Sequence, residues 1–202
     1  MTKLHVDSIN QTNTDIQFRF DDKLIHAHRN ILSCRSSYFR ALLLSDFKEK
    51  SQTTPIELTD VDHDTFSQIL HYIYKASYDT AMPFDTAIKV MFYANKINFL
   101  TAKHGAIEHI CCHLRSNHQD ILSLYCLIKP LSPAFDILLE YIYDLITEHL
   151  YDISRQKDFQ DLDKDHLVDL ICQTASRREN QKILNYPEIV DTIPGDTDSD
   201  ID

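Results

Sequence analysis

The amino-acid sequence predicts an α+β fold, in which a small sheet near the N-terminus has flanking helices and an all-α region follows. Apolar and polar side chains alternate over "DIQFRF", residues 15–20, as in a half-buried strand. From Arg29 onward the apolar residues recur at helical spacing instead. After residue 116 helical spacing is the dominant pattern, so the sheet belongs to the first part of the chain.

The sheet is predicted to begin with a β-hairpin. Ile16, Phe18 and Phe20 share one face of the first strand, "DDK" supplies the turn and "LIHAH" continues extended. A further short strand, "PIEL", is predicted at Pro55, where the missing N–H of proline is tolerated. Before it, "DFKEKSQTT" (residues 46–54) is polar and poor in helix formers, which predicts a loop.

Three helices are predicted after the sheet. Asp62 caps the first, Asp85 opens the second, and residues 100–114 form the third. The apolar side chains of the first helix recur at offsets 0, 3, 4 and 7, namely Phe66, Ile69, Leu70 and Ile73.

The chain is expected to have four parts: an N-terminal extension (1–14), the α+β domain (15–116), an all-α region (117–176) and a mostly disordered acidic tail (177–202). The tail is predicted from "PGDTDSDID", which carries four aspartates and has almost nothing to bury.

Net charge argues against two classes of function. A formal charge of -11 disfavours nucleic-acid binding, which needs a concentrated positive surface, and adsorption to anionic membranes. No apolar run approaches the ~20 residues of a membrane span, and the first residues lack the apolar core of a signal peptide. We therefore expect a cytoplasmic protein, with the nucleus as an alternative location.

The glycine and cysteine content argues against nucleotide-binding loops and against a disulfide framework. Only Gly105 and Gly195 occur, which excludes glycine-rich phosphate-binding loops. An odd number of cysteines within apolar helical patterns predicts reduced thiols rather than a disulfide framework: Cys34, Cys111, Cys112, Cys126 and Cys172.

Two histidine clusters raise the question of a metal site. His26 and His28 point to the same face of an extended segment, and His109 and His113 are spaced to share a helix face. Neither cluster has the three or four ligands that zinc requires, and Cys112 lies away from the second. No nucleophile elbow or converging carboxylates are present. We expect structural histidines, no metal, no cofactor and no enzymatic activity.

The order of these segments resembles the BTB (POZ) domain. In "TDIQFRFDDKLIHAHRNILSCRSSYFRALL" an Asp precedes a strand pair, His-x-His-Arg follows, and then an "R-S-x-Y-F-R-A-L" type of segment. "IELTDVDHDTFSQILHYIYKA" is similar to the third strand and helix of that family. The resemblance covers residues 15–115. It implies an interaction module that docks on other BTB domains and on cullin-3, the scaffold of a multisubunit ubiquitin ligase.

The helical remainder is similar to part of a BACK domain, the usual partner of BTB domains in ubiquitin-ligase adaptors. The similarity is carried by "FDILLEYIYDLITEHLYDISRQKDFQDLDKDHLVDLI", in which an apolar helix precedes Phe-x-x-Leu and Leu-x-x-Leu units.

The resemblance also implies a cullin contact. Adaptor members insert an apolar-x-Glu motif into the cullin, and this chain has Phe47-Lys48-Glu49 in the corresponding loop. Burial of a Phe at an interface contributes ~2 kcal/mol, and Glu49 could accept hydrogen bonds from the partner. The alternative is that Phe47 folds back on its own domain and anchors the loop.

The family further implies a role for Asp15 and Arg29. In members that repress transcription the matching residues form a charged pocket, and a structural ion pair that orients the first strand is the alternative. Family dimers often use a leucine-rich helix before the first strand, for which the first fourteen residues offer little apolar material. A homodimer or a heterodimer with another BTB protein stays open.

We therefore expect a cullin-3 adaptor, or a competitor for the cullin-3 site, with an unknown substrate protein. The sequence shows no repeats with the period of a β-propeller, the kind of domain with which many adaptors bind their substrates. The alternative is a self-assembling BTB scaffold without a ligase role.

Overall fold

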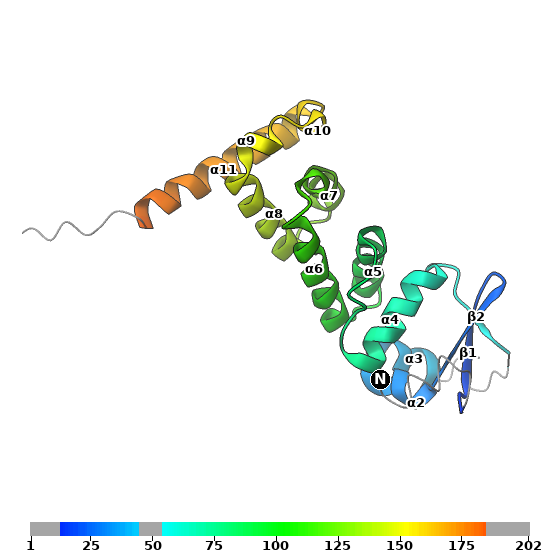
Figure 1. The fold of residues 1–202 in the computed structure, drawn as a ribbon. Coiled ribbons are helices and arrows are strands. Elements are labelled where there is room, and N and C mark those ends of the chain that lie inside the picture. Colours follow the sequence, from blue (N-terminus) through cyan, green and yellow to red (C-terminus); the bar gives the residue numbers. More distant parts are fainter. Residues whose placement is uncertain (1–12, 45–53, 185–202) are drawn as a thin grey trace, which may run out of the picture. The chain divides into compact units, whose positions relative to one another are not determined.

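The computed structural model describes residues 13–44 and 54–184. Contacts divide the chain into two compact units, residues 1–141 and 142–202. Figure 1 shows the sheet and the helices α2 to α7 of the first unit, and the helices of the second. The sequence predicts a boundary after residue 116, between the α+β domain and the all-α region. That boundary separates two family-like modules, whereas the division after residue 141 separates two compact units, so the predicted boundary stays a prediction.

A three-stranded sheet forms the N-terminal end of the first unit. Strands β1 (Ile16–Phe20) and β2 (Lys23–Ala27) are antiparallel, β3 (Ile56–Glu57) runs parallel to β1, and the order is β2-β1-β3. The turn between β1 and β2 uses the left-handed conformation of Asp21 (φ 50°), which an Asp adopts more readily than most residues. The predicted hairpin and short third strand are thereby confirmed.

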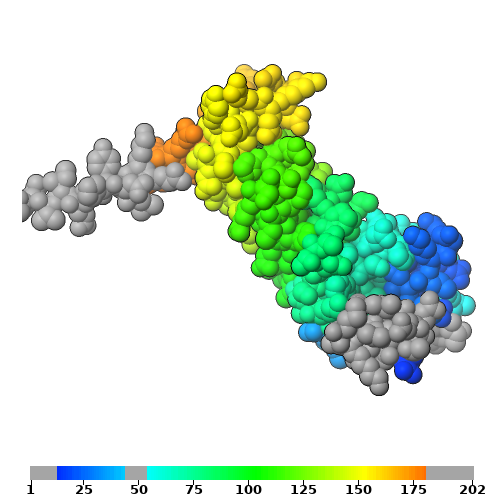
Figure 2. Space-filling model, in the orientation of Figure 1, coloured from blue at the N-terminus to red at the C-terminus, as the bar shows by residue number. Residues whose placement is uncertain are grey.

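Helices cover one face of this sheet (Figure 1). The first unit contains α2 (Arg29–Arg35), α3 (Ser37–Leu44), α4 (His63–Lys75), α5 (Phe84–Lys96), α6 (Leu100–Leu114), α7 (Ile121–Ile128) and the 3₁₀ turns η2 (His118–Asp120) and η3 (Lys129–Leu131). In Figure 2 the surface of α4 continues without a break into that of α5 and α6.

An aromatic cluster joins sheet and helices. The ring of Phe18 on β1 lies 4.9 Å from that of Phe66 on α4 and 6.1 Å from that of Phe39 on α3, and all three side chains are fully buried. Edge and tilted contacts at these separations add to the free energy of burial. The alternation of β1 places Phe18 in the core, because every second side chain of a strand points to the same face.

The ends of α4 follow from local chemistry. Asp62 caps the helix, as predicted, because its carboxylate Oδ1 accepts a hydrogen bond from the backbone N–H of Thr65 at 2.8 Å. At the other end Ala76 turns the chain with a φ of 56°. The next helix, α5, begins at Phe84 after Pro83, one residue before the predicted Asp85.

Helix α6 approaches α4 closely at Gly105. A Cβ atom on this residue would lie 2.9 Å from the ring of Tyr72 and 3.3 Å from that of Tyr78. The Tyr72 ring is held between Tyr78 (4.8 Å) and Phe99 (5.8 Å), so it has little room to withdraw. Glycine is required here by the close approach of the helices.

Helix α8 (Asp136–Glu148) enters the second unit, which also contains α9 (Leu150–Ile153), α10 (Lys157–Gln160) and α11 (Lys164–Leu184). The buried apolar residues in the described part of the second unit are Ile142, Tyr143, Leu145, Ile146, Ile153 and Leu170.

Helix α11 differs from the expectation for the tail. It continues to Leu184, so the first residues assigned to a disordered tail from residue 177 are helical. The sequence "SRRENQKIL" offers little to bury, but Arg, Glu, Gln, Lys and Leu are strong helix formers. The Arg177 side chain also binds α8, since its Nε donates to Asp144 Oδ1 at 3.0 Å. In the described part of the chain, no helix has the length and apolarity that crossing a membrane would need.

Candidate interaction groove

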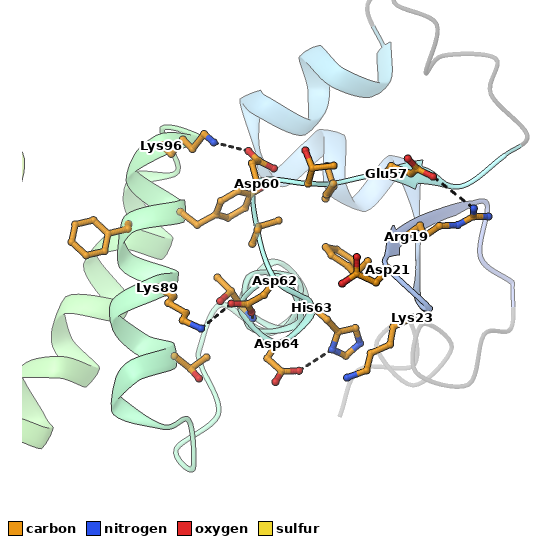
Figure 3. A pocket seen from close by; sticks show the side chains of 18 of the residues that line it. Arg19, Asp21, Lys23, Glu57, Asp60, Asp62, His63, Asp64, Lys89 and Lys96 are labelled. Atoms are coloured by element: carbon orange, nitrogen blue, oxygen red, sulfur yellow. Dashed lines mark hydrogen bonds and ion pairs between the residues drawn. The ribbon is translucent and has the colours of Figure 1, made fainter.

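A charged groove on the first unit is the candidate functional site. Three segments line it: the β1–β2 turn (residues 19–23), the chain from Glu57 to Thr65, and one face of α5 (Figure 3). The α5 residues that face it are Thr86, Lys89, Phe92, Tyr93 and Lys96, whose spacing places them on one side of a helix.

Ion pairs cross the groove between α5 and the segment before α4. Lys96 Nζ lies 2.7 Å from Asp60 Oδ2, and Lys89 Nζ lies 3.0 Å from Asp62 Oδ2 (Figure 3). Exposed pairs of this kind contribute only ~0–1 kcal/mol to folding. They fix the positions of four charged groups at the surface, which is what recognition of another charged surface needs.

Asp62 stays ionised within this arrangement. Burial by itself raises the pKa of the Asp62 carboxyl, but the hydrogen bond from Thr65 and the pairing with Lys89 outweigh it. The pKa of Asp62 therefore lies below its ordinary value. One carboxylate thus caps α4 and also binds α5.

Two aromatic side chains of α5, Phe92 and Tyr93, also line the groove. Tyr93 is 5% exposed, and its pKa is raised by burial, with smaller contributions from Tyr38 and Asp60. Phe92 packs edge-on against Phe135, with ring centroids 5.2 Å apart. Aromatic side chains beside charged groups of both signs suit contact with a protein surface.

The predicted cullin motif, Phe47-Lys48-Glu49, lies outside the described residues. It belongs to the segment that connects α3 to β3, and β3 ends at Glu57 in the groove. Glu49 precedes Ile56 by seven positions, so a short stretch of sequence connects the motif to one wall of the groove.

The structure brings Asp15 and Arg29 together at the entry to β1. The backbone N–H of Arg29 donates to Asp15 Oδ1 at 2.7 Å, and its Nε donates to the carbonyl oxygen of Asp15 at 3.4 Å. The Asp15 N–H in turn donates to the carbonyl of Ala27 at 3.2 Å. These contacts join the start of β1 to the start of α2. The choice between a charged pocket and a structural pair stays a prediction.

The histidines of each cluster bind separate partners. His26 Nδ1 lies 3.4 Å from Thr14 Oγ1, and His28 Nδ1 lies 2.6 Å from the Tyr74 hydroxyl. His109 Nε2 contacts the Met82 carbonyl at 2.9 Å.

His113 belongs to a different contact from His109. Its Nε2 lies 2.7 Å from Asp120 Oδ2, and its ring stacks on Phe84. Burial raises the pKa of the Cys111 thiol nearby to about 11. Within residues 13–44 and 54–184, no three His, Cys, Asp or Glu side chains are grouped so as to hold a metal ion.

Sequence reasoning missed the groove. Its charged residues lie at exposed positions, which periodicity does not distinguish from ordinary solvated surface. One signal was available: Thr86, Lys89, Tyr93 and Lys96 fall on a single face of the predicted second helix.

The fold and the groove define a protein-interaction module, and comparison with known proteins identifies its family. The family model for the BTB/POZ domain matches residues 7–114, more than half of the chain. The chain belongs to the BTB/POZ family. The helical region after the match fits a BACK-like region.

Several curated proteins are similar to this chain. BTB/POZ domain-containing protein 9 from Homo sapiens is 31% identical over 120 residues, which cover 57% of this chain and 20% of that protein. Kelch-like protein 38 from Homo sapiens is 35% identical over 86 residues (43% and 14%). Kelch-like protein 40 from Xenopus laevis is 45% identical over 60 residues (30% and 10%). The chain therefore spans a fifth or less of the length of these relatives.

Proposed function

We propose that this protein binds the N-terminal domain of cullin-3, either as an adaptor of a ubiquitin ligase or as a competitor for the adaptor site. BTB/POZ membership and the similarity to Kelch-like proteins support an interaction role. The observation that carries the proposal is the position of Phe47-Lys48-Glu49 in the chain, seven positions before a strand that ends in the charged groove.

The two parts of this surface would contribute differently. Phe47 is the anchor, since burial of its ring at an interface contributes ~2 kcal/mol. The ion pairs at Asp60 and Asp62 present fixed charges of both signs in the groove. Fixed charges of this kind set the specificity and the association rate more than the affinity.

A pull-down tests the proposal. The full chain is incubated with immobilised cullin-3 N-terminal domain, and retention is expected. A Kelch-like BTB adaptor added in excess should displace it, because both would occupy the same site. Absence of retention at high micromolar concentration would contradict the proposal that this protein binds cullin-3.

Competition separates the two roles. A competitor lowers ubiquitination of the Kelch-like adaptor's substrate and adds no substrate of its own. An adaptor leads to ubiquitination of a protein that the Kelch-like adaptor does not recruit. A cytoplasmic or nuclear location goes with either role, and fractionation of cells that express the full chain would test it.

Self-assembly without a ligase role is the second candidate. Strand β2 forms one edge of the sheet in the described residues, and its Leu24 is 43% exposed. A sheet edge with an exposed apolar side chain is a surface on which a second BTB domain could pair. Light scattering would then show an oligomer whose mass does not change with concentration or with added cullin-3.

A further inference from the structure

The ring of Phe92 in the groove has a buried support. Phe92 lies on α5 and lines the groove, and its ring meets that of Phe135 edge-on with the two centroids 5.2 Å apart. Phe135 is 2% exposed, so the supporting ring lies in the interior of the first unit. The orientation of the Phe92 ring therefore depends on where Phe135 is held.

Phe135 reaches α5 from a turn outside the matched domain. The turn lies between η3 and α8, and Phe135 directly precedes Asp136, the first residue of α8. The match to the BTB/POZ family model ends at residue 114. The support of Phe92 is therefore not part of the matched domain, and its position depends on an attachment to that domain.

The Lys103 ammonium on α6 provides this attachment. Its Nζ donates to the carbonyl oxygen of Ala134 at 3.0 Å and to Asn95 Oδ1 at 3.2 Å. It also lies 5.5 Å from the centroid of the Phe135 ring. Asn95 is on α5, three positions after Phe92. One ammonium group thus binds α5, the turn and the ring that supports Phe92.

Loss of the ammonium should move the turn without unfolding it. A lysine ammonium offers three donors, and a charged donor makes stronger hydrogen bonds than a neutral one. The turn also has a hydrogen bond of its own, from the N–H of Ala134 to the carbonyl of Leu131 at 3.0 Å. Without Lys103 the turn should keep its form and lose its fixed position on α5.

We propose that Lys103 is a positioning residue of the groove: it holds Phe135 against Phe92 and so fixes the aromatic ring that a partner meets. The identification of this partner as cullin-3 rests on the function proposed above. The position of the Phe92 ring in the free protein does not, so the two can be tested separately.

A tryptophan at position 92 reports on the ring. The chain contains no tryptophan, so the fluorescence of Phe92→Trp comes from the groove alone. Adding Lys103→Met should shift the emission to the red and increase quenching by acrylamide, because the indole loses its support. Lys103→Arg should preserve the emission, since a guanidinium can also donate to the carbonyl and lie over the ring.

The matched control is Lys164→Met, at an exposed position of the second unit, which should leave the emission unchanged. A role of Lys103 in stability alone would lower the urea midpoint and leave the emission of the folded chain as it is. That result would overturn the proposal.

Titration with the cullin-3 N-terminal domain tests the same residue in the chain without tryptophan, and it decides the question if Phe92→Trp does not fold. Lys103→Met should bind roughly 2- to 10-fold more weakly, the range that an aromatic pair spans. In the Phe92→Ala background this loss should disappear, because Lys103 acts through that ring. A loss that persists there would indicate direct contact of Lys103 with the partner and would overturn the proposal.

Failure of the proposed function looks different. A parent chain that does not bind cullin-3 contradicts that function, and the emission of Phe92→Trp with and without Lys103→Met then decides the role of Lys103. A parent chain that binds, with an equal affinity for Lys103→Met, leaves the function in place and overturns the role of Lys103.

Discussion

The guanidinium carbon of Arg177 lies 4.8 Å from the centroid of the Tyr143 ring, and its Nε donates to Asp144 one residue further on. The Tyr143 hydroxyl in turn donates to Asp169 Oδ2 at 2.6 Å. These contacts bind α11 to α8 at two positions two turns apart. They hold Arg177, the first residue of the polar stretch 177–184, against α8.

Replacing Arg177 should loosen the second unit. Arg177→Ala removes a cation–π contact and a charge-assisted hydrogen bond from a side chain that is 16% exposed. The expected loss is about 1–2 kcal/mol. Hydrogen exchange of the α11 amides should speed up accordingly. The neighbouring exposed Arg178→Ala should change it little, and equal effects of the two variants would contradict the role given to Arg177.

Adding a methyl group at Gly105 should destabilise the first unit. Alanine favours a helix over glycine by ~1 kcal/mol, but the Cβ would meet the confined Tyr72 ring at 2.9 Å. Overpacking of this kind costs about 1–3 kcal/mol. We expect a net loss of stability for Gly105→Ala in urea denaturation. Thr101→Ala, at an exposed position of α6, is the control, and a stabilised Gly105→Ala would show that the ring gives way.

Asp62 should give the first unit part of its acid sensitivity. Its pKa in the folded chain lies below the ordinary value of 3.8. Its contribution to stability is therefore complete above that value and is lost as the pH falls through the folded pKa. Asp62→Asn keeps an effective cap and removes the titrating group, whereas Asp62→Ala costs about 1 kcal/mol at neutral pH.

Urea denaturation between pH 2 and pH 7 measures this difference. The Asn variant should lose less stability on acidification than the parent chain. An identical slope for both proteins would show that other carboxylates account for the pH dependence.

Reversing a charge in the groove should weaken cullin-3 binding without unfolding the protein. Lys89→Glu places a like charge beside Asp62 and changes the rim that the partner would meet. We expect roughly a 10-fold weaker affinity, equivalent to ~1.4 kcal/mol, and a changed dependence on salt. Lys164→Glu, at an exposed position of the second unit, should bind as the parent does.

Periodicity predicted the hairpin and the first helices because their buried residues recur at regular spacing. Phe18 is fully buried and lies on the predicted face of β1, and Asp62 caps α4 where its sequence position predicts. These features depend on neighbours close in sequence, so local patterns reveal them.

The groove and the length of α11 depend on contacts between distant segments. Lys96 meets Asp60 across thirty-six positions, and Arg177 meets Asp144 across thirty-three. A single charged residue is not part of a periodic pattern, so the sequence does not predict which distant residue it pairs with. The expected tail begins at residue 177 because the residues from there on offer little to bury. Composition does not show that the Arg177 guanidinium packs on the ring of Tyr143.

Calorimetric titration of Phe47→Ala against the cullin-3 N-terminal domain tests the central claim most directly. We predict that the parent chain binds and that Phe47→Ala binds about 30-fold more weakly, as the loss of ~2 kcal/mol requires. Tyr151→Ala, which removes a 72% exposed aromatic ring from the second unit, should bind as the parent does. An equal affinity of Phe47→Ala and the parent chain would contradict the claim.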